Sequence, residues 1–546
     1  MPRGIPLAQR AAPLLPALAL LLLALLGCNR GLWTPDEPRE AEISREMALA
    51  PSVIPTLNGH RFIEKPPLYY WTVAAVYRLT GGASVLGARA VSVAAGVATL
   101  ALVVAWGTAA HSRAAGWLAA LMLATSVQFM VSSHWVLLDP LLMLCTTLAA
   151  WAAWELLARR ESTAVRLLFY LALVLALWIK GLIGPVLIGA GLTLYVLVDR
   201  PAHWRRLRPI TTVSLVTLAV LLLGLAIWSR GGRAALWEWG YVNHVQRVID
   251  PGITGHRQPL LYYGWTLPFA ALPWLPPLLE ALRPAHWRRV SVAGLHRVCD
   301  PARYGALMSA AMVVVLSLSL TKRETYLLPA LPLLFLWLGI RSYEWWQDWQ
   351  LRATVRLGML WWLQVALLCA YVLAPPLAGW IWRGRVQAEV LAGLLAAVLC
   401  VAWLLYASAT GRRERAGPAA VLCAVAGSAL TLGLAPALLD QTKDMGPFVR
   451  WIGRQLPADR PVFATGVDET LAAEFPFYTG RAVVTLDTRT LRRSGGLPSR
   501  PDWVVVQDNH DGRAISLAPD YTLIAARSFG PHRSLLLWRL AASPAP

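Results

Sequence analysis

The chain has 546 residues, of which 57% are apolar and only 15% are charged, and its formal net charge is +20. Soluble domains are nearer half apolar and one quarter charged, so this composition excludes an ordinary soluble enzyme and indicates a membrane protein. Arginine lies mostly in short segments between apolar runs, which is how orientation is set in a bilayer, so no nucleic-acid partner is expected.

The first apolar segment, residues 11–28, follows Arg3 and Arg10 and has two interpretations. A cleaved signal peptide has this charge pattern, and "LLGC" loosely resembles a lipoprotein cleavage site. However, about 18 apolar residues are enough to cross a bilayer, and many further spans follow. We therefore expect an uncleaved first transmembrane helix.

A window of about 19 residues finds further apolar spans along the chain. Thirteen spans result, at 11–28, 84–107, 114–132, 135–157, 165–180, 182–198, 209–228, 259–281, 304–320, 325–341, 356–377, 388–408 and 418–439. The sequence therefore predicts an α-helical polytopic membrane protein.

Basic residues alternate from one side of these spans to the other. If the N-terminus is cytoplasmic, every inside connection contains arginine, as the positive-inside rule requires. These residues are Arg113; Arg159, Arg160 and Arg166; Arg200, Arg205, Arg206 and Arg208; Arg283, Arg288, Arg289 and Arg297; Arg341 and Arg352; and Arg412, Arg413 and Arg415. The segments 29–83 and 229–258 and the tail from 440 then lie outside.

The tail, residues 440–546, differs in character from the rest. The segments "PVFAT", "RAVVTLD", "DWVVVQD" and "SLLLWRL" are short β-rich runs separated by Gly, Pro and Asp. They predict a small extracytoplasmic α/β domain. Its charges form no catalytic cluster, so we expect a lid or accessory domain, beside a transmembrane catalytic domain at 1–439.

Ionisable residues gather at the predicted outer face. They are Asp36, Glu37, Glu64 and Lys65 in the first outside loop, Asp139 and Lys180 at span boundaries, His244 and Arg247 in the second loop, and Lys322, Arg323 and Tyr326 between two later spans. Charges at membrane depth are costly, so they are expected to face a polar cavity or one another. This asymmetry favours an anionic lipid ligand and acid or base chemistry. A transporter more often places polar residues near the midplane of two matching halves, a pattern that we do not find.

Each of these residues also has a structural interpretation. In "TPDE", Thr34 fits an N-cap, Pro35 the first helical residue and Glu37 the capping-box partner. Asp139 before a proline likewise fits an N-cap. The cations fit contacts with lipid phosphates, and His244 alone fits a structural role. Taken singly, these residues do not establish catalysis.

The motifs together resemble a known family. In their order and at about their separations, the following motifs resemble those of the aminoarabinose transferases that modify lipid A: "LWTPDEPREAEISREM", "LNGHRFIEKPPLYYWTVAAVYRLTG", "VLLDP", "IKGLIGP", "NHVQR" and "KRETYLLPALP". More broadly, they resemble the bacterial relatives of protein O-mannosyltransferases among the GT-C glycosyltransferases. The resemblance covers essentially the whole membrane part, whereas the tail adds little.

The resemblance implies a transferase in the bacterial inner membrane that takes a sugar from a polyprenyl-phosphate donor and works, with inversion, on the periplasmic side. It assigns the donor phosphate to Lys65, with Arg247, Lys180 and Tyr326 as further ligands. It makes Asp36 a general base or acceptor-orienting carboxylate, with Asp139 as a second carboxylate. Glu64 and His244 match positions that can hold a divalent metal such as zinc in the aminoarabinose branch, although two protein ligands make a weak site.

The sugar and the acceptor stay open at this point. Aminoarabinose transfer to lipid A is the leading expectation, and another sugar moved to an envelope glycan or to protein Ser/Thr is the alternative. Pro38 in "DEPRE" departs from the small polar residue that is typical of the aminoarabinose enzymes. A lipid transporter or flippase without catalysis is the competing class.

Overall fold

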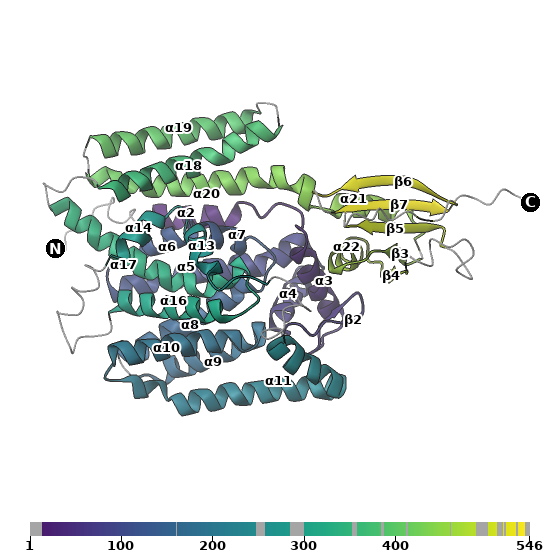
Figure 1. Cartoon of the computed structure of the whole chain (residues 1–546), viewed down its shortest axis with the longest axis horizontal. Coiled ribbons are helices and arrows are strands. Elements are labelled where there is room, and N and C mark those ends of the chain that lie inside the picture. Colours follow the sequence, from purple (N-terminus) through teal and green to yellow (C-terminus); the bar gives the residue numbers. More distant parts are fainter. Residues whose placement is uncertain are drawn as a thin grey trace, which may run out of the picture. The chain divides into compact units, whose positions relative to one another are not determined.

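The computed structural model describes most of the chain. The described residues are 14–159, 161–246, 257–283, 300–351, 358–383, 387–410, 413–458, 460–487, 501–509, 517, 520–530 and 533–540. They form two compact units (Figure 1). The membrane unit comprises Met1–Cys28, Glu64–Pro66 and Ser92–Ala435, and the loop–tail unit comprises Asn29–Ile63, Pro67–Val91 and Pro436–Pro546.

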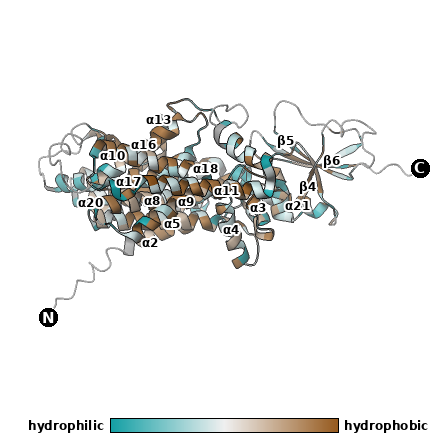
Figure 2. Ribbon diagram, turned by 90° about the horizontal axis from the view of Figure 1, so that it is seen from below, coloured by the Kyte–Doolittle hydropathy of each residue, from teal (hydrophilic) through white to brown (hydrophobic). Residues whose placement is uncertain are grey.

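Helices make up nearly all of the membrane unit, and apolar residues dominate their ribbons in Figure 2. The elements are α2 (Leu14–Leu25), α5 (Val85–Ala110), α6 (Arg113–Ala124), α7 (Val127–Ser133), α8 (Asp139–Ala158), α9 (Thr163–Lys180), α10 (Ile183–Asp199), η1 (Trp204–Leu207), α11 (Pro209–Trp237), η2 (Glu238–Gln246), α13 (Tyr262–Ala270), α14 (Leu275–Ala281), α16 (Pro301–Leu318), η3 (Glu324–Ala330), α17 (Leu331–Leu351), α18 (Met359–Arg383), α19 (Ala388–Ala409) and α20 (Arg413–Lys443). The first residues of α5 and the last of α20 belong to the loop–tail unit.

The predicted spans all overlap helices, and the multi-pass membrane fold is confirmed. Within the described ranges, nine helices are long and apolar enough to cross a bilayer, and the bent pair α6 and α7 would make a tenth. Two shorter apolar helices cover Pro16–Leu25 and Ile183–Asp199. The number of thirteen transmembrane helices stays a prediction.

Two of the predicted spans are interrupted. The span expected at 114–132 bends by 69° between α6 and α7. At the bend, the hydroxyls of Thr125 and Ser126 donate to the carbonyls of Leu121 and Leu123, both at 2.7 Å. The span expected at 259–281 breaks between α13 and α14, where the indole of Trp274 donates to the Thr125 hydroxyl at 2.9 Å. The two hydroxyls share these carbonyls with the N–H groups of Thr125 and Ser126, each of which donates to the same oxygen at 3.1 Å.

Small residues allow three helices of the membrane unit to approach closely. A Cβ placed on Gly107 of α5 would lie 2.6 Å from the Cα of Gly116 in α6. A Cβ placed on Gly339 of α17 would lie 2.5 Å from the Cα of Ala119, also in α6. Because apolar burial alone does not drive association within a bilayer, such close backbone packing is a main source of helix–helix attraction there.

The loop–tail unit has an α/β fold. It contains α3 (Asp36–Leu49), β1 (Thr56–Leu57), β2 (His60–Arg61), α4 (Leu68–Leu79), α21 (Gly446–Gln455), β3 (Val462–Thr465), α22 (Glu469–Thr479), β4 (Val483–Thr485), β5 (Trp503–Asp508), β6 (Tyr521–Ser528) and β7 (Ser534–Leu540). The larger sheet has the order β4-β3-β5-β7-β6, parallel from β4 to β5 and antiparallel beyond. The four predicted β-rich runs are β3, β4, β5 and β7, so the predicted α/β tail is confirmed, whereas β6 was missed.

The first outside loop packs on the tail within this unit. The Asn58 side chain donates to the carbonyl of Val483 at 2.7 Å and accepts from its N–H at 2.9 Å, so it pairs with the free side of edge strand β4. Arg39 of α3 forms an ion pair with Glu469 of α22 at 2.7 Å. The predicted boundary at 439/440 lies close to Pro436, but the expected assignment of 29–83 to the transmembrane domain differs from this grouping.

Glu42 of α3 is fully buried beside Arg45, whose guanidinium it binds through both carboxylate oxygens at 2.7 Å. Burial raises the pKa of Glu42 from 4.5 to about 7, against the opposing effect of Arg45. The folded state therefore keeps a proton at pH values where the unfolded chain has released it. The stability that protonated Glu42 contributes to the folded state is complete below pH 4.5 and is lost as the pH rises through 7.

We predict that the local stability of α3 falls between pH 5 and 8, by up to about 3 kcal/mol for a shift of this size. Hydrogen exchange of the α3 amides, corrected for intrinsic rates, measures this opening free energy. Glu42→Gln should flatten the pH dependence, whereas Glu389→Gln, at an exposed position of α19, should leave it unchanged. The same slope in Glu42→Gln and the wild type would show that another group is responsible.

Candidate active site

Asp139 and Lys180 form an ion pair in the membrane unit. The Lys180 Nζ lies 2.5 Å from the Asp139 Oδ1, and the side chains are 15% and 7% exposed. Asp139 is the first residue of α8 and Lys180 the last of α9, where the helix dipoles favour a negative and a positive charge respectively. Gly181, with a φ of 73°, ends α9 in a conformation that glycine adopts without a steric penalty.

Tyr326 of η3 completes this group, because the Lys180 Nζ lies over its ring at 4.2 Å from the centroid. Lys322 is 2% exposed and donates from Nζ to the Gln258 carbonyl at 3.2 Å. The carbonyl of Arg323 accepts from the Tyr263 hydroxyl at 3.1 Å. The structure therefore brings Asp139, Lys180 and Tyr326 together as a group, the Asp139–Lys180–Tyr326 cluster, whereas the Lys322 ammonium binds a main-chain oxygen.

Of the other site residues predicted in the membrane unit, the structure describes some and not others. Glu64 and Lys65 are partly buried, and they group with this unit although the residues on both sides belong to the loop–tail unit. Arg247 and the side chain of His244 lie outside the described residues.

The expected metal site, Glu64 and His244, lies only partly within the described residues. Among the side chains that the structure describes, no group of three or more His, Cys, Asp or Glu residues is arranged to hold a metal. The pairing of Glu64 with His244 stays a prediction because the described residues exclude the His244 side chain.

Asp36 is the first residue of α3 in the loop–tail unit. Its carboxylate is 13% exposed and accepts from Arg39 at 3.0 Å. Arg39 also binds Glu40 at 2.8 Å and Glu469 at 2.7 Å, so three carboxylates share one guanidinium. Because these carboxylates outnumber it, the pKa of Arg39 is raised despite burial, which keeps the arginine charged. Asp36 is thereby held in place at the start of a helix, with part of its surface accessible.

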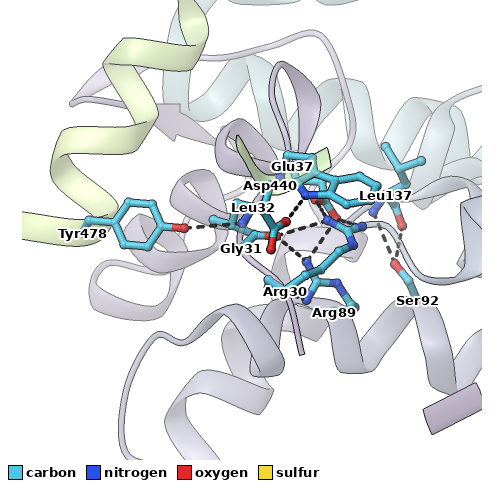
Figure 3. Close-up of polar contacts among 10 residues, drawn as sticks. Arg30, Gly31, Leu32, Glu37, Arg89, Ser92, Leu137, Asp440 and Tyr478 are labelled. Atoms are coloured by element: carbon cyan, nitrogen blue, oxygen red, sulfur yellow. Dashed lines mark hydrogen bonds and ion pairs between the residues drawn. The ribbon is translucent and has the colours of Figure 1, made fainter. Parts of the chain in front are cut away.

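Glu37 is enclosed by two arginines (Figure 3). Arg30 donates to both oxygens of the Glu37 carboxylate, at 2.5 and 3.0 Å, and Arg89 donates to one of them at 3.4 Å. The N–H of Trp33 donates to the same carboxylate at 2.6 Å. Arg89 also donates to the carbonyls of Arg30 and Gly31 at 3.1 and 3.0 Å. With 0% of its side chain exposed, Glu37 holds the entry to α3, and its assignment to the site stays a prediction.

The capping interpretations of both motifs are wrong. The residue that precedes α3 is Pro35, with no side-chain cap, and Glu37 binds Arg30 and Trp33 and does not form a capping box with Thr34. The residue that precedes α8 is Leu138, so Asp139 is helical and binds Lys180. At the start of α8 a buried cation takes the carboxylate that was expected to cap the helix, whereas Glu37 binds arginines and the N–H of Trp33 together.

Arg30, Arg39 and Arg89 were missed by the sequence analysis. Arg89 had a visible signal, because it is a charged residue within the apolar span predicted at 84–107, and such residues are costly unless paired. Arg30 and Arg39 resemble ordinary loop charges in the sequence. Their roles depend on contacts with Glu37 and Glu469 that no local pattern contains.

Comparisons with known proteins support the resemblance. Residues 18–234 match the family model described as dolichyl-phosphate-mannose-protein mannosyltransferase. The chain is 30% identical over 342 residues to the undecaprenyl phosphate-alpha-4-amino-4-deoxy-L-arabinose arabinosyl transferase of Pseudomonas aeruginosa (strain LESB58), covering 61% of this chain and 59% of that relative. It is 26% identical over 479 residues to the protein of the same name from Enterobacter sp. (strain 638), covering 84% and 82%. The chain thus spans less than two thirds of the first of these relatives.

Solved structures share the fold. ArnT from Cupriavidus metallidurans bound to undecaprenyl phosphate matches 99% of this chain and 100% of its own length, with a TM-score of 0.73 and 20% identity. The archaeal oligosaccharyltransferase AglB from Archaeoglobus fulgidus, in complex with an inhibitory peptide and a dolichol-phosphate, matches 92% of this chain and 70% of its own, with a TM-score of 0.53 and 11% identity. The resemblance to aminoarabinose transferases and the GT-C type of fold are confirmed.

We predict that Glu37→Gln destabilises the loop–tail unit, because Arg30 and Arg89 would lose the negative charge that balances them. Breaking a buried ion pair in this way costs about 3–5 kcal/mol. The measurement is the urea concentration at which a protease cleaves this unit in the detergent-solubilised chain. An unchanged midpoint would contradict the role assigned to Glu37, and Glu389→Gln serves as the matched exposed control.

Proposed function

We propose that this protein is an integral-membrane glycosyltransferase that moves a sugar from a polyprenyl-phosphate carrier to an acceptor of the cell envelope. The observation that carries the proposal is the Asp139–Lys180–Tyr326 cluster at one end of the helices of the membrane unit. The similarity to transferases named for an undecaprenyl phosphate-linked aminoarabinose supports it. The family model for dolichyl-phosphate-mannose transferases supports the same class of donor.

The donor half of the reaction needs a cation at the phosphate. When the bond between the anomeric carbon and the phosphate oxygen breaks, the bonding electrons stay on that oxygen, and a lipid phosphate leaves with increased negative charge. Lys180 supplies an ammonium held by Asp139 and by the face of Tyr326, so its position is set before the donor arrives. Lys65 is the second proposed phosphate ligand, by its motif. In this account Asp139 positions Lys180.

The acceptor half needs a base. An acceptor hydroxyl attacks the anomeric carbon, a new carbon–oxygen bond forms as the bond to phosphate breaks, and the hydroxyl proton passes to a carboxylate. The resemblance assigns this role to Asp36, which Arg39 holds in the first turn of α3. One displacement of this kind inverts the anomeric centre.

We base the proposed substrates and location on the similar aminoarabinose transferases. Aminoarabinose is the proposed sugar, and lipid A is the proposed acceptor. The proposed location is the bacterial inner membrane, with the acceptor reaction and the loop–tail unit on the periplasmic side. A protein hydroxyl is the second candidate acceptor, favoured by the mannosyltransferase family model. A flippase would move the lipid and leave the sugar attached.

The proposal is tested by reconstituting the full chain in liposomes with a panel of polyprenyl-phosphate sugars, offering lipid A or a Ser/Thr peptide as the acceptor. Release of polyprenyl phosphate and the mass of the acceptor are measured. Transfer supports an enzyme and identifies the acceptor. Lipid movement across the bilayer without sugar transfer by any donor would show that the protein is a flippase.

With the donor and acceptor that support transfer, we predict that Asp36→Asn lowers kcat about 10²- to 10⁴-fold, which is the usual contribution of a general base. The KM for the donor should change little. A hydrogen-exchange pattern of α3 like that of the wild type verifies that the variant is folded. Full turnover by the folded variant would remove Asp36 from the reaction.

Lys180→Met should lower turnover about 10²- to 10³-fold, because it removes one cation from the developing phosphate charge. Asp139→Asn should cause a smaller loss, since the ammonium remains but is less firmly held. Lys443→Met, at an exposed lysine in the last turn of α20, is the control. Equal and small effects of the Lys180 and Lys443 replacements would contradict the phosphate-binding role.

A further inference from the structure

Glu474 of α22 is completely buried in the loop–tail unit. It is 0% exposed, and neither oxygen of its carboxyl group has a hydrogen-bond partner among the described residues. A carboxylate is tolerated inside a protein only when it is paired and hydrogen-bonded, so an isolated carboxyl group in such a place keeps its proton. The sugar-transfer reaction proposed above makes no use of this residue.

The charged groups around Glu474 do not compensate a negative charge at this position. Asp444, which follows α20, and Asp468, which precedes α22, have the same sign as an ionised Glu474. Arg533 is one of two cations nearby. Its guanidinium is already bound to the Asp468 carboxylate at 2.5 Å and to the Thr470 hydroxyl at 3.1 Å.

Arg450 of α21 is the other cation near this carboxyl group. Its side chain is exposed, and its guanidinium lies 4.8 Å from the centroid of the Tyr478 ring. From α3, the guanidinium of Arg39 reaches α22 but binds Glu469 there. The strands β1 and β4 also pack on α22, and neither contains an ionisable residue. None of the described cations is therefore bound to Glu474.

Burial raises the pKa of Glu474 well above its ordinary value of 4.5, and the charge of Asp444 raises this pKa further, against the opposing effects of Arg533 and Arg450. Between pH 4.5 and the raised pKa, the folded unit therefore holds a proton that the unfolded chain has released. The stability that protonated Glu474 contributes is complete below pH 4.5 and is lost as the pH rises through the raised pKa.

The helix that carries this carboxyl group touches the first outside loop near both of its ends. At the start of α22, Glu469 binds Arg39 of α3 at 2.7 Å, and Arg39 in turn holds Asp36 at 3.0 Å. Near the end of α22, the Tyr478 hydroxyl accepts from the N–H of Leu32 at 3.5 Å (Figure 3). The position of α22 therefore affects how firmly Asp36 is held.

We propose that Glu474 is a proton-dependent latch that holds α22 against the first outside loop. In the acid form, the neutral carboxyl group stays buried and α22 keeps both contacts. When the proton passes to water, an unpaired negative charge is left beside Asp444, and this charge becomes hydrated only if α22 moves away from its neighbours. The movement separates Glu469 from Arg39, so Asp36 is held firmly only while the latch is closed.

Hydrogen exchange of the α22 amides, corrected for intrinsic rates, measures this movement in the full chain in detergent. For the wild type, we expect the equilibrium constant of opening to be up to about tenfold larger at pH 6 than at pH 5, which is the limit for the release of one proton. Glu474→Gln, which mimics the neutral carboxyl group, should lower this ratio by the same factor.

Asp502→Asn is the matched control, because the Asp502 carboxylate belongs to the same unit and is 63% exposed. It should leave the ratio of the two opening constants as in the wild type. An equal ratio in Glu474→Gln and the wild type would overturn the latch.

The link between the latch and turnover rests on the proposed function, whereas the movement of α22 does not. With a donor and acceptor that support transfer, the turnover of Glu474→Gln relative to the wild type should rise between pH 5 and pH 8. A constant relative turnover would overturn the control of activity by the latch. Absence of transfer by both proteins would count against the proposed function, and hydrogen exchange would then decide on the latch.

Discussion

The cost of burying a charged side chain constrains both units of this protein. In the loop–tail unit, Glu37 has no exposed surface and is balanced by Arg30 and Arg89. In the membrane unit, Asp139 and Lys180 are almost as enclosed and balance each other. A buried charge is tolerated only when it is paired and its remaining lone pairs or protons are bonded. Each pair therefore fixes the positions of the segments that carry it.

The two pairs have different consequences. Glu37 uses its oxygens within the fold, so its carboxylate serves to hold the start of α3 and, with it, the neighbouring Asp36. The Lys180 ammonium contacts one carboxylate oxygen of Asp139 and the ring face of Tyr326, and the Lys180 side chain keeps 15% of its surface exposed. An ammonium of this kind is prepared to meet a phosphate without moving, which is the property that the proposed donor chemistry requires.

Much of the fold follows from local patterns in the sequence. Long apolar runs gave the membrane helices, and β-rich runs between turn residues gave four strands of the tail. The alternation of basic loops placed Asp139 and Lys180 at one interface, and the structure shows them in contact. These predictions succeeded because hydropathy and charge averaged over a window determine whether a segment enters a bilayer.

The remaining features depend on contacts between residues far apart in the chain. Asn58 pairs with Val483, and Arg39 with Glu469, so the grouping of the first outside loop with the tail has no local signal. The breaks at Thr125 and Trp274 lie within windows whose average hydropathy is high.

The central claim is that Lys180 binds the phosphate of the lipid donor, and solid-state NMR tests it directly. The dipolar coupling between the ³¹P of bound undecaprenyl phosphate and a ¹⁵N-labelled lysine Nζ is measured in liposomes, with Lys180→Arg used to assign the signal. The account predicts a strong coupling to Lys180, as expected for a charge-assisted hydrogen bond. A bound lipid whose phosphorus shows no coupling to Lys180 would contradict it.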